Sequence, residues 1–361
     1  MKRTIFHIAC IISLVLIGNT VLLATGQGEL PPGGVTRTIV DGLGRSVEIP
    51  AEPERMITAG RAMLMTINAL WAFPGAPDRM LAVGDIQQGR GVFLADMDPA
   101  WERLTILDRS VGAEQIASLN PDVVVLKSVV RESIGEPLER LGIPVVYVDL
   151  ENSEQYQRDL RVLGSLVNDT ARGEELAELY RTMQERVTAT VSTTAPRPRT
   201  LMIYHRVAGG DVSFNVPPAG WMQTDMVRMA GGEPVWLDAN PGRGWATVSF
   251  EQIAAWDPEV ILFVEYGGQG TEIRDQLVQE PRWQELQAVQ NNRFLVMPTD
   301  YYSWDQPDVR WILGLTWSAW AISGQEISME ATTREFFSAL YGMDTATFNR
   351  MVAPVLAGDV P

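Results

Sequence analysis

The sequence has very little thiol or imidazole chemistry. Its single cysteine, Cys10, and one of its two histidines lie in an apolar N-terminal stretch, which leaves His205 as the only histidine elsewhere. One cysteine cannot form a disulfide within the chain, and the chain has neither a His-Glu-x-x-His pair nor a Gly-x-Ser-x-Gly turn. We therefore predict no catalytic residue, no cofactor and no metal ion bound directly by the protein. A secreted enzyme that uses a pair of carboxylates stays open as an alternative, although no spacing singles out a pair among the 45 acidic residues.

Lysine is almost absent as well. Apart from Lys2, the only lysine is Lys127, so arginine carries nearly all the positive charge. The formal net charge is −16, and it becomes −18 if Lys2 and Arg3 are removed with a leader. Such a charge repels nucleic acids and acidic membrane surfaces, and we expect no nucleic-acid partner. The planar arginine fork suits carboxylates and oxyanions, but a compositional bias of the genome explains the arginine content equally well.

The N-terminus has the layout of a secretory signal. Lys2 and Arg3 precede an apolar stretch that ends in the small residues 24–26, which predicts a signal peptide over 1–26 with cleavage near Gly26. A retained membrane anchor is the alternative, because the apolar stretch approaches membrane-spanning length. Residues 27–35 are rich in glycine and proline and are expected to be disordered. The mature protein is expected in the periplasm or at the cell surface.

An internal repeat indicates two lobes. Residues 114–126 and 251–263 share Glu-Gln-Ile-Ala at the start, then a proline and a valine at matching positions. Each copy predicts a short helix that stops before the proline, followed by a strand of Val, Ile and Leu that is buried on both faces. A length of 361 residues also exceeds the ~250 at which single cores stop growing. We predict two Rossmann-like α/β lobes.

A long amphipathic helix is predicted between the lobes. Apolar residues recur at helical spacing from Thr170 to Val191, which corresponds to a helix of ~20 residues and ~30 Å. The predicted organisation is an N-terminal lobe at 36–168, a connecting helix at 169–195 and a C-terminal lobe at 196–361. A small hairpin is expected within 36–49, further strands at 81–83, 145–148, 201–204 and 294–297, and helices at 137–141 and 281–289.

The order of several short motifs resembles one protein family. The motifs are 44–50 followed by 53–57, 111–116 with 119–122, 141–145, 230–232, 245–252 and 313–317. In these the chain resembles the substrate-binding proteins of ABC importers for ferric siderophores, haem and cobalamin, the class III periplasmic binding proteins with two lobes joined by one rigid helix. The resemblance implies a monomeric, exported solute-binding protein that captures a small metal chelate or oxyanion. It also implies delivery of that ligand to a transmembrane permease dimer.

The resemblance further assigns a role to one glutamate of each lobe. In the family, an exposed glutamate at the start of the repeated helix docks onto arginines of the permease, and Glu114 and Glu251 match that position. Two carboxylates on equivalent tips would orient a basic partner. A glutamate also favours the first turn of a helix through the helix dipole, which explains both positions without docking.

Ligand contacts are expected in the loops that follow the strands, because ligands of open α/β sheets bind beyond the carboxyl ends of the strands. Glycine-flanked arginines could hold carboxylate or metal-complex oxygens, and aromatic rings could stack on catechol, porphyrin or corrin groups. Ordinary surface arginines and aromatic core packing explain the same residues. The predicted ligand-binding residues are Arg61, Arg90, His205, Arg206, Trp221, Arg243, Trp245, Tyr301, Tyr302 and Trp304.

The ligand is expected to be an already chelated metal, since importers of bare zinc or manganese need several histidines. A ferric siderophore is the first choice, and molybdate or tungstate held with Arg61 or Arg206 is the second. Haem or cobalamin follows. Trp245 matches a ligand-stacking tryptophan of the cobalamin branch, but its counterpart in the first lobe is Asp108, which argues against a tetrapyrrole held between two tryptophans.

Overall fold

The structure is a computed structural model that describes residues 34–86, 89–191, 195–208 and 211–361. The predicted signal peptide and nearly all of the predicted disordered segment lie outside these residues. Among the helices in the described ranges, none has both the length and the apolar character needed to cross a membrane.

The first lobe is built on a five-stranded parallel sheet in the order β5-β4-β3-β6-β7. Its strands are β3 (Met56–Thr58), β4 (Met80–Gly84), β5 (Thr105–Leu107), β6 (Val123–Lys127) and β7 (Val145–Val148). All residues of β6 and β7 are buried, as expected for apolar strands covered on both faces. The connecting helices are α1 (Met63–Trp71), α2 (Ala76–Arg79), α3 (Phe93–Met97), α4 (Ala113–Ala117), α5 (Glu136–Arg140) and α6 (Ser153–Leu166), with short turns of helix at Pro99–Arg103, Ser128–Val130 and Arg131–Gly135. The predicted hairpin is present as β1 (Thr36–Val40) and β2 (Ser46–Pro50).

The second lobe has a mixed sheet in the order β11-β9-β8-β12-β13. Its strands are β8 (Arg199–Ala208), β9 (Asp211–Val216), β10 (Glu233–Pro234), β11 (Ala246–Val248), β12 (Val260–Val264) and β13 (Phe294–Val296). Its helices are α8 (Met222–Met229), α9 (Phe250–Trp256), α10 (Gly270–Leu277), α11 (Pro281–Gln284), α12 (Gln287–Gln290) and α13 (Trp311–Ser323), with a turn at Leu237–Ala239. Strands β8, β12 and β13 run parallel, whereas β9 is antiparallel to both β8 and β11. Only two residues separate β8 from β9, too few for the crossover of a dozen or more residues that a parallel neighbour needs.

The sequence repeat corresponds to a structural repeat. Helix α4 precedes β6 as α9 precedes β12. The glutamine side chain of each repeat caps the N-terminus of its helix. The Gln115 side chain accepts a hydrogen bond from Gly112 N at 3.1 Å, and Gln252 accepts one from Ser249 N at 2.9 Å. The residue before each repeat proline has a positive φ, 50° at Asn120 and 37° at Asp257. The shared residues therefore encode the start and the end of the same helical turn.

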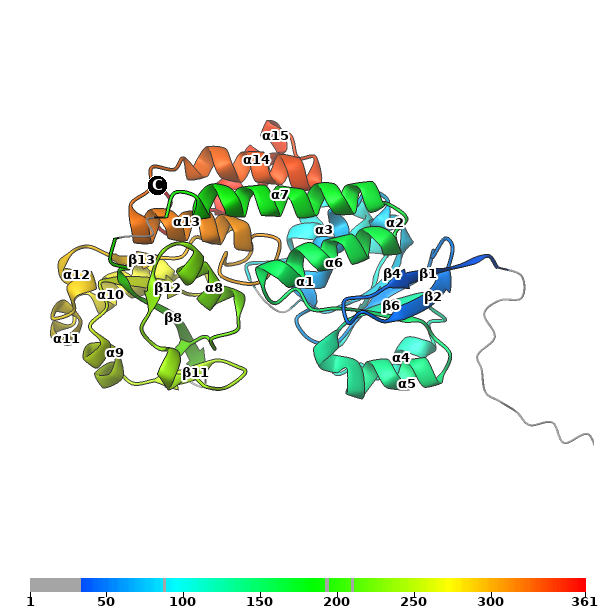
Figure 1. Ribbon diagram of the computed structural model, residues 1–361, viewed down its shortest axis with the longest axis horizontal. Coiled ribbons are helices and arrows are strands. Elements are labelled where there is room, and N and C mark those ends of the chain that lie inside the picture. Colours follow the sequence, from blue (N-terminus) through cyan, green and yellow to red (C-terminus); the bar gives the residue numbers. More distant parts are fainter. Residues whose placement is uncertain (1–33, 87–88, 192–194, 209–210) are drawn as a thin grey trace, which may run out of the picture.

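Helix α7 (Thr170–Thr188) spans both lobes, as Figure 1 shows in green along the upper side of the molecule. It packs on α6 where two glycines face each other: a Cβ atom on Gly164 would lie 2.8 Å from the Gly173 Cα atom. The predicted connecting helix is thus present. It ends at Thr188, ahead of the predicted end, and residues 192–194 lie outside the described ranges.

The C-terminal helices cross back to the first lobe. Helix α14 (Met329–Tyr341), followed by α15 (Thr345–Met351) and a turn at Ala353–Val355, runs along α7 in Figure 1. The ring of Phe93 in the first lobe lies 5.6 Å from Phe337 and 5.4 Å from Tyr341, and the Tyr341 hydroxyl donates to Asn68 O at 3.1 Å. The last part of the chain therefore joins the two lobes rather than completing the second one.

Candidate functional site

A backbone hydrogen bond joins loops at the strand ends of the two lobes. Glu151 follows β7 of the first lobe, and its carbonyl oxygen accepts from the backbone N–H of Met222, the first residue of α8, at 3.0 Å. The neighbouring residue, Trp221, is thereby placed next to the first lobe. This contact brings together the strand-end loops in which ligands of open α/β sheets bind.

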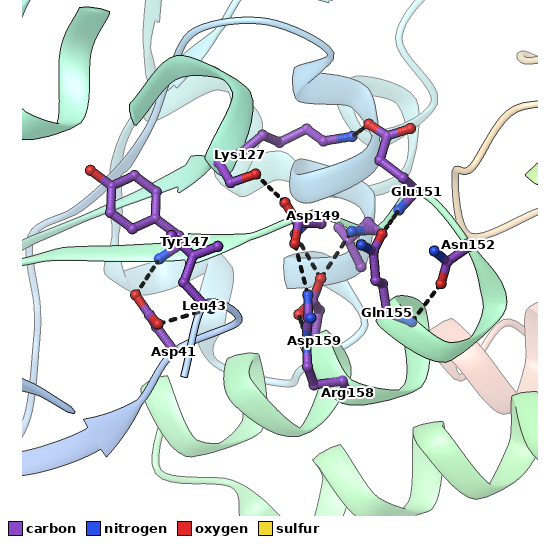
Figure 2. Close-up of polar contacts among 12 residues, drawn as sticks. Asp41, Leu43, Lys127, Tyr147, Asp149, Glu151, Asn152, Gln155, Arg158 and Asp159 are labelled. Atoms are coloured by element: carbon purple, nitrogen blue, oxygen red, sulfur yellow. Dashed lines mark hydrogen bonds and ion pairs between the residues drawn. The ribbon is translucent and has the colours of Figure 1, made fainter. Parts of the chain in front are cut away.

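On the first lobe, the strand ends carry a network of polar contacts (Figure 2). Lys127 ends β6, is 1% exposed, and pairs its Nζ with the carboxylate of Glu151. A buried ammonium needs such a partner, because an unpaired buried charge is strongly destabilising. The only lysine after position 2 is therefore used to hold the residue at which the lobes meet.

The turn after β7 is held in a strained conformation. Leu150 has a φ of 56°, a region that branched residues rarely adopt. The buried Asp159 carboxylate accepts hydrogen bonds from Asp149 N at 2.7 Å and Leu150 N at 2.9 Å, as Figure 2 shows. Burial raises the pKa of Asp159, and the Arg158 guanidinium, 2.8 Å away, opposes that rise. These contacts fix the position of Glu151.

The second lobe presents four partly exposed rings, here called the aromatic wall: Tyr204, Trp221, Trp245 and Tyr266. Tyr204 and Tyr266 are stacked, with ring centroids 4.5 Å apart and planes 30° apart. Trp245 lies 5.2 Å from Tyr204 and 5.8 Å from Trp221. Rings that are neither buried nor fully exposed offer flat apolar faces to a ligand.

A buried acid lies behind the aromatic wall. The Tyr266 hydroxyl donates to Asp305 Oδ2 at 3.0 Å, and Gln223 Nε2 lies 3.4 Å from the same oxygen. Asp305 has no exposed surface, and burial raises its pKa to about 6, although its hydrogen bonds work in the opposite direction.

Three of the predicted arginines are available for a ligand. Arg61, Arg206 and Arg243 are exposed, and their side chains form no hydrogen bond or ion pair with any residue that the structure describes, although Arg206 pairs with Ser213 through its place in strand β8. Arg61 stands at the start of α1 between Gly60, with a φ of 103°, and Ala62, with a φ of 56°. Within the described residues, each lobe therefore offers a guanidinium fork that oxygen ligands could use.

The fourth predicted arginine, Arg90, has a different setting. Its backbone N–H donates to Tyr301 O at 2.8 Å and its Nη1 donates to Val355 O at 3.1 Å. Its side chain also lies against Gly268, where a Cβ atom would come within 2.7 Å of the Arg90 Cδ atom. Arg90 therefore connects the first lobe to the second.

His205 is placed inside the second lobe. It is 8% exposed and lies 5.9 Å from the Phe214 ring and 5.8 Å from the Phe263 ring. Burial lowers its pKa, which favours the neutral form. Its visible role is packing, and a contact with a ligand stays a prediction.

The aromatic segment at 301–304 lies at the joint between the lobes. The Tyr301 hydroxyl donates to Asp96 at 2.8 Å, and the Tyr302 oxygen accepts from Phe93 N at 3.2 Å. Tyr302 and Trp304 have no exposed surface, and Tyr301 is 8% exposed. Too little of these rings is accessible for direct contact with a ligand in this state, and their visible role is to join the lobes.

A charged group that the sequence did not indicate stabilises this joint. Arg310 has no exposed surface and binds Asp300 at 2.7 Å and Asp308 at 2.9 Å. Asp308 also accepts from Asn68 of the first lobe at 2.7 Å, and the guanidinium lies over the Phe93 ring at 4.7 Å. We refer to Arg310, Asp300 and Asp308 as the buried triad.

Glu114 and Glu251 occupy equivalent places on the two lobes. Each lies in the first turn of its helix, α4 or α9, and each is exposed. Figure 1 shows both helices on the side of the molecule opposite α7 and α14. The two exposed glutamates thus belong to helices on the same side of the molecule.

Comparison with known proteins identifies the class. Residues 92–301 match the family model described as periplasmic binding protein, and the chain belongs to this family. It is a solute-binding protein of the kind that serves ABC transporters. A search of curated protein sequences finds no match. In the described part of the chain, no group of three or more His, Cys, Asp or Glu residues is arranged to hold a metal ion.

Solved structures agree with the fold. A periplasmic solute-binding protein from Veillonella parvula is 20% identical, with a TM-score of 0.69 over 88% of this chain and 97% of its own. The molybdate-binding protein MolA of Haemophilus influenzae, solved with molybdate, is 20% identical, with a TM-score of 0.67 over 85% and 98%. The TroA-like binding protein FepB of Veillonella parvula is 18% identical, with a TM-score of 0.68 over 84% and 95%.

Proposed function

We propose that this protein captures a chelated metal, a ferric siderophore-type iron complex, between its two lobes and delivers it to an ABC permease. The observation that carries the proposal is the aromatic wall of the second lobe, and arginine side chains without a described partner in both lobes add support. Flat rings and free guanidinium forks together suit a ligand that has both an apolar face and negatively charged oxygens.

A ferric catecholate complex has these two features. Its catechol rings can pack against Tyr204 and Trp245, while its oxygen atoms can accept hydrogen bonds from Arg61 and Arg206. The net charge of the protein, −16, would repel a free anion at long range, so the local arginines have to supply the attraction.

An oxyanion is the second candidate. The structural likeness to MolA, which was solved with molybdate, supports it. Arg61 at the start of the nine-residue helix α1 offers a positive side chain next to a helix N-terminus, an arrangement that favours anions. Four rings would contribute little to binding so small and polar a ligand, and for this reason the iron chelate is preferred.

Haem and cobalamin fit less well. Trp245 belongs to the aromatic wall, but the equivalent position in the first lobe is the exposed Asp108, which accepts a hydrogen bond from Ser110 N at 2.8 Å. A flat macrocycle would therefore find a ring on one side only.

For delivery, we propose that Glu114 and Glu251 dock onto the permease. Support comes from their exposure, their equivalence in the structural repeat and their display on one side of the molecule. A pair of separated carboxylates would fix both the position and the orientation of a basic partner.

Titration of intrinsic tryptophan fluorescence tests the proposed ligand class. The purified protein would be titrated with a ferric tricatecholate, a ferric trihydroxamate, haemin, cobalamin and molybdate. We expect saturable quenching by a ferric chelate with a Kd of about 1 μM or tighter, which corresponds to about −8 kcal/mol. Saturation by molybdate alone would move the assignment to the oxyanion, and no response from any compound would contradict the proposal.

A further inference from the structure

Behind the aromatic wall lies a group of buried polar side-chain atoms whose capacity to accept hydrogen bonds is not fully used. Gln223 on α8 is 3% exposed, Asp305 is 0% exposed and Ser303 is 1% exposed. Gln223 Oε1 and Asp305 Oδ1 have no hydrogen-bond partner among the residues that the structure describes, and Ser303 Oγ has none with good geometry, although its hydroxyl lies close enough to lower the pKa of Asp305. Leaving one such atom unpaired costs about 1–3 kcal/mol, so buried polar atoms of this kind are nearly always satisfied by a water molecule, an ion or a ligand.

The contacts that do exist place Gln223 and Asp305 side by side. Gln223 Nε2 and the Tyr266 hydroxyl both approach Asp305 Oδ2, at 3.4 Å and 3.0 Å. Both donors point to the same oxygen, so the acceptor capacity of Oδ1 is unused. The group thus combines an amide oxygen, a carboxylate and a hydroxyl, which together can accept more hydrogen bonds than their own donors supply.

Tyr266 connects this group to the candidate site. Its ring stacks on Tyr204 at 4.5 Å as part of the aromatic wall, while its hydroxyl is bonded to Asp305. Tyr266 is partly exposed, whereas Asp305 and Gln223 are buried. A turn of the Tyr266 side chain would therefore open the acceptors to a ligand held at the wall.

We propose that Asp305, Gln223 and Ser303 form an inner binding site that receives an ammonium group carried by the ligand. An ammonium group has three donors and a positive charge, so it satisfies the unpaired acceptors and neutralises the carboxylate at the same time. The aromatic faces along its path favour a cation as well. This inference rests on the proposed function, because the wall has to be the place where the ligand binds.

Binding of a proton to Asp305 competes with binding of the ammonium group. With the inner site empty, a proton on Asp305 can be donated to Gln223 Oε1, and burial accordingly raises the Asp305 pKa to about 6. Below that pH the acid is neutral and does not attract an ammonium group, and above it the carboxylate is charged. Affinity for an ammonium-bearing ligand should therefore rise as pH increases through about 6.

Other ionisable groups lie around the site, and their pKa values are shifted differently from that of Asp305. Burial raises the pKa of Tyr266 and that of Tyr204, so both stay neutral below pH 8. Burial lowers the pKa of His205, and Glu265 and Arg206 act on the neighbouring rings through their charges. An Asp305→Asn variant separates the effect of Asp305 from all of these, because it keeps the shape of the side chain and removes its titration.

The test compares two chelates that differ only at one amine. Ferric desferrioxamine B carries a free primary amine, and its N-acetyl derivative does not. We expect the amine-bearing chelate to bind about tenfold more tightly at pH 7.5 than at pH 5, since the ionised fraction of an acid of pKa about 6 changes by that factor. The acetylated chelate should show a much smaller change. In Asp305→Asn, checked for folding by circular dichroism, the difference between the two chelates should vanish.

Equal pH dependence of the two chelates, or discrimination that survives in Asp305→Asn, would overturn the inner site. The proposed function fails only if the ferric tricatecholate also leaves the protein unchanged. If neither desferrioxamine chelate binds, the inner site is decided by n-butylammonium and n-butanol as an iron-free pair. Fluorescence quenching by n-butylammonium that increases above pH 6 and disappears in Asp305→Asn would uphold it. Identical effects of the two compounds would contradict it.

Discussion

Import is expected to fall to background when Glu114 and Glu251 are both replaced by alanine, while the affinity for the ligand stays unchanged. Both side chains are exposed, on helices that lie on the side of the molecule opposite α7, so their removal should alter stability by no more than about 0.5 kcal/mol. Their loss removes the paired negative charge that we propose the permease recognises. Uptake of a radiolabelled ferric chelate by cells that carry the variant, together with a fluorescence titration of the purified variant, measures the two effects separately.

A matched control is available on the opposite side of the molecule. Glu326 and Glu335 are exposed and lie before and within α14, far from α4 and α9 in Figure 1. Replacing both by alanine removes the same charge and should leave import intact. Import that persists in the Glu114 and Glu251 variant, or ligand affinity that falls together with import, would refute the docking role.

Removing Arg310 should be the most damaging single change to stability. Arg310→Ala leaves the carboxylates of Asp300 and Asp308 buried without their cation, and loss of one partner of a buried ion pair typically costs 3–5 kcal/mol. The guanidinium also fills space over the Phe93 ring. We expect a free energy of unfolding lower by about that amount, measured by urea denaturation.

Arg282→Ala serves as the control for this variant. Arg282 also has an ion pair, with Glu280 at 2.8 Å, and lies over an aromatic ring, Phe250 at 4.8 Å, but both of its contacts are at the surface. Its loss should cost less than about 1 kcal/mol. A similar decrease in the free energy of unfolding in the two variants would contradict the prediction that burial makes Arg310 the more important of the two arginines.

The parts of the fold that could be predicted from the sequence are those that depend on residues close together in the chain. The repeated Glu-Gln-Ile-Ala segments encode helix caps within four residues, and α7 has a helical periodicity nineteen residues long. Both were predicted correctly. The hairpin of β1 and β2 followed from a short turn between alternating residues, and the structure confirms it.

The parts that escaped prediction depend on contacts between distant segments. Tyr302 was expected at the ligand, but its hydroxyl accepts a hydrogen bond from Phe93 N at the joint between the lobes. No pattern of neighbouring residues predicts this contact. In the inner binding site, Gln223 contacts Asp305, which lies 82 residues away in the sequence. Tyr204 stands at the end of an apolar run, where a buried strand residue and a ligand contact have the same sequence pattern.

Of the predicted site, only some residues come together. Trp221 and Trp245 lie in the aromatic wall, and Arg61, Arg206 and Arg243 keep free side chains. Flanking glycines indicated Arg61 and Arg243, whereas Arg206, expected in a loop after a strand at 201–204, lies within the longer strand β8. Burial was not visible in the sequence, and His205 and Trp304 were therefore grouped with accessible residues although they are packed inside.

The proposed ligand touches both lobes at once. Isothermal titration with a ferric tricatecholate tests this most directly, with wild-type protein, Arg61→Ala from the first lobe, Trp245→Ala from the second, and Arg282→Ala as a surface control. We predict at least a tenfold loss of affinity, about 1.4 kcal/mol, in each lobe variant and none in the control. Wild-type affinity in both the Arg61 and the Trp245 variant would contradict a site between the lobes.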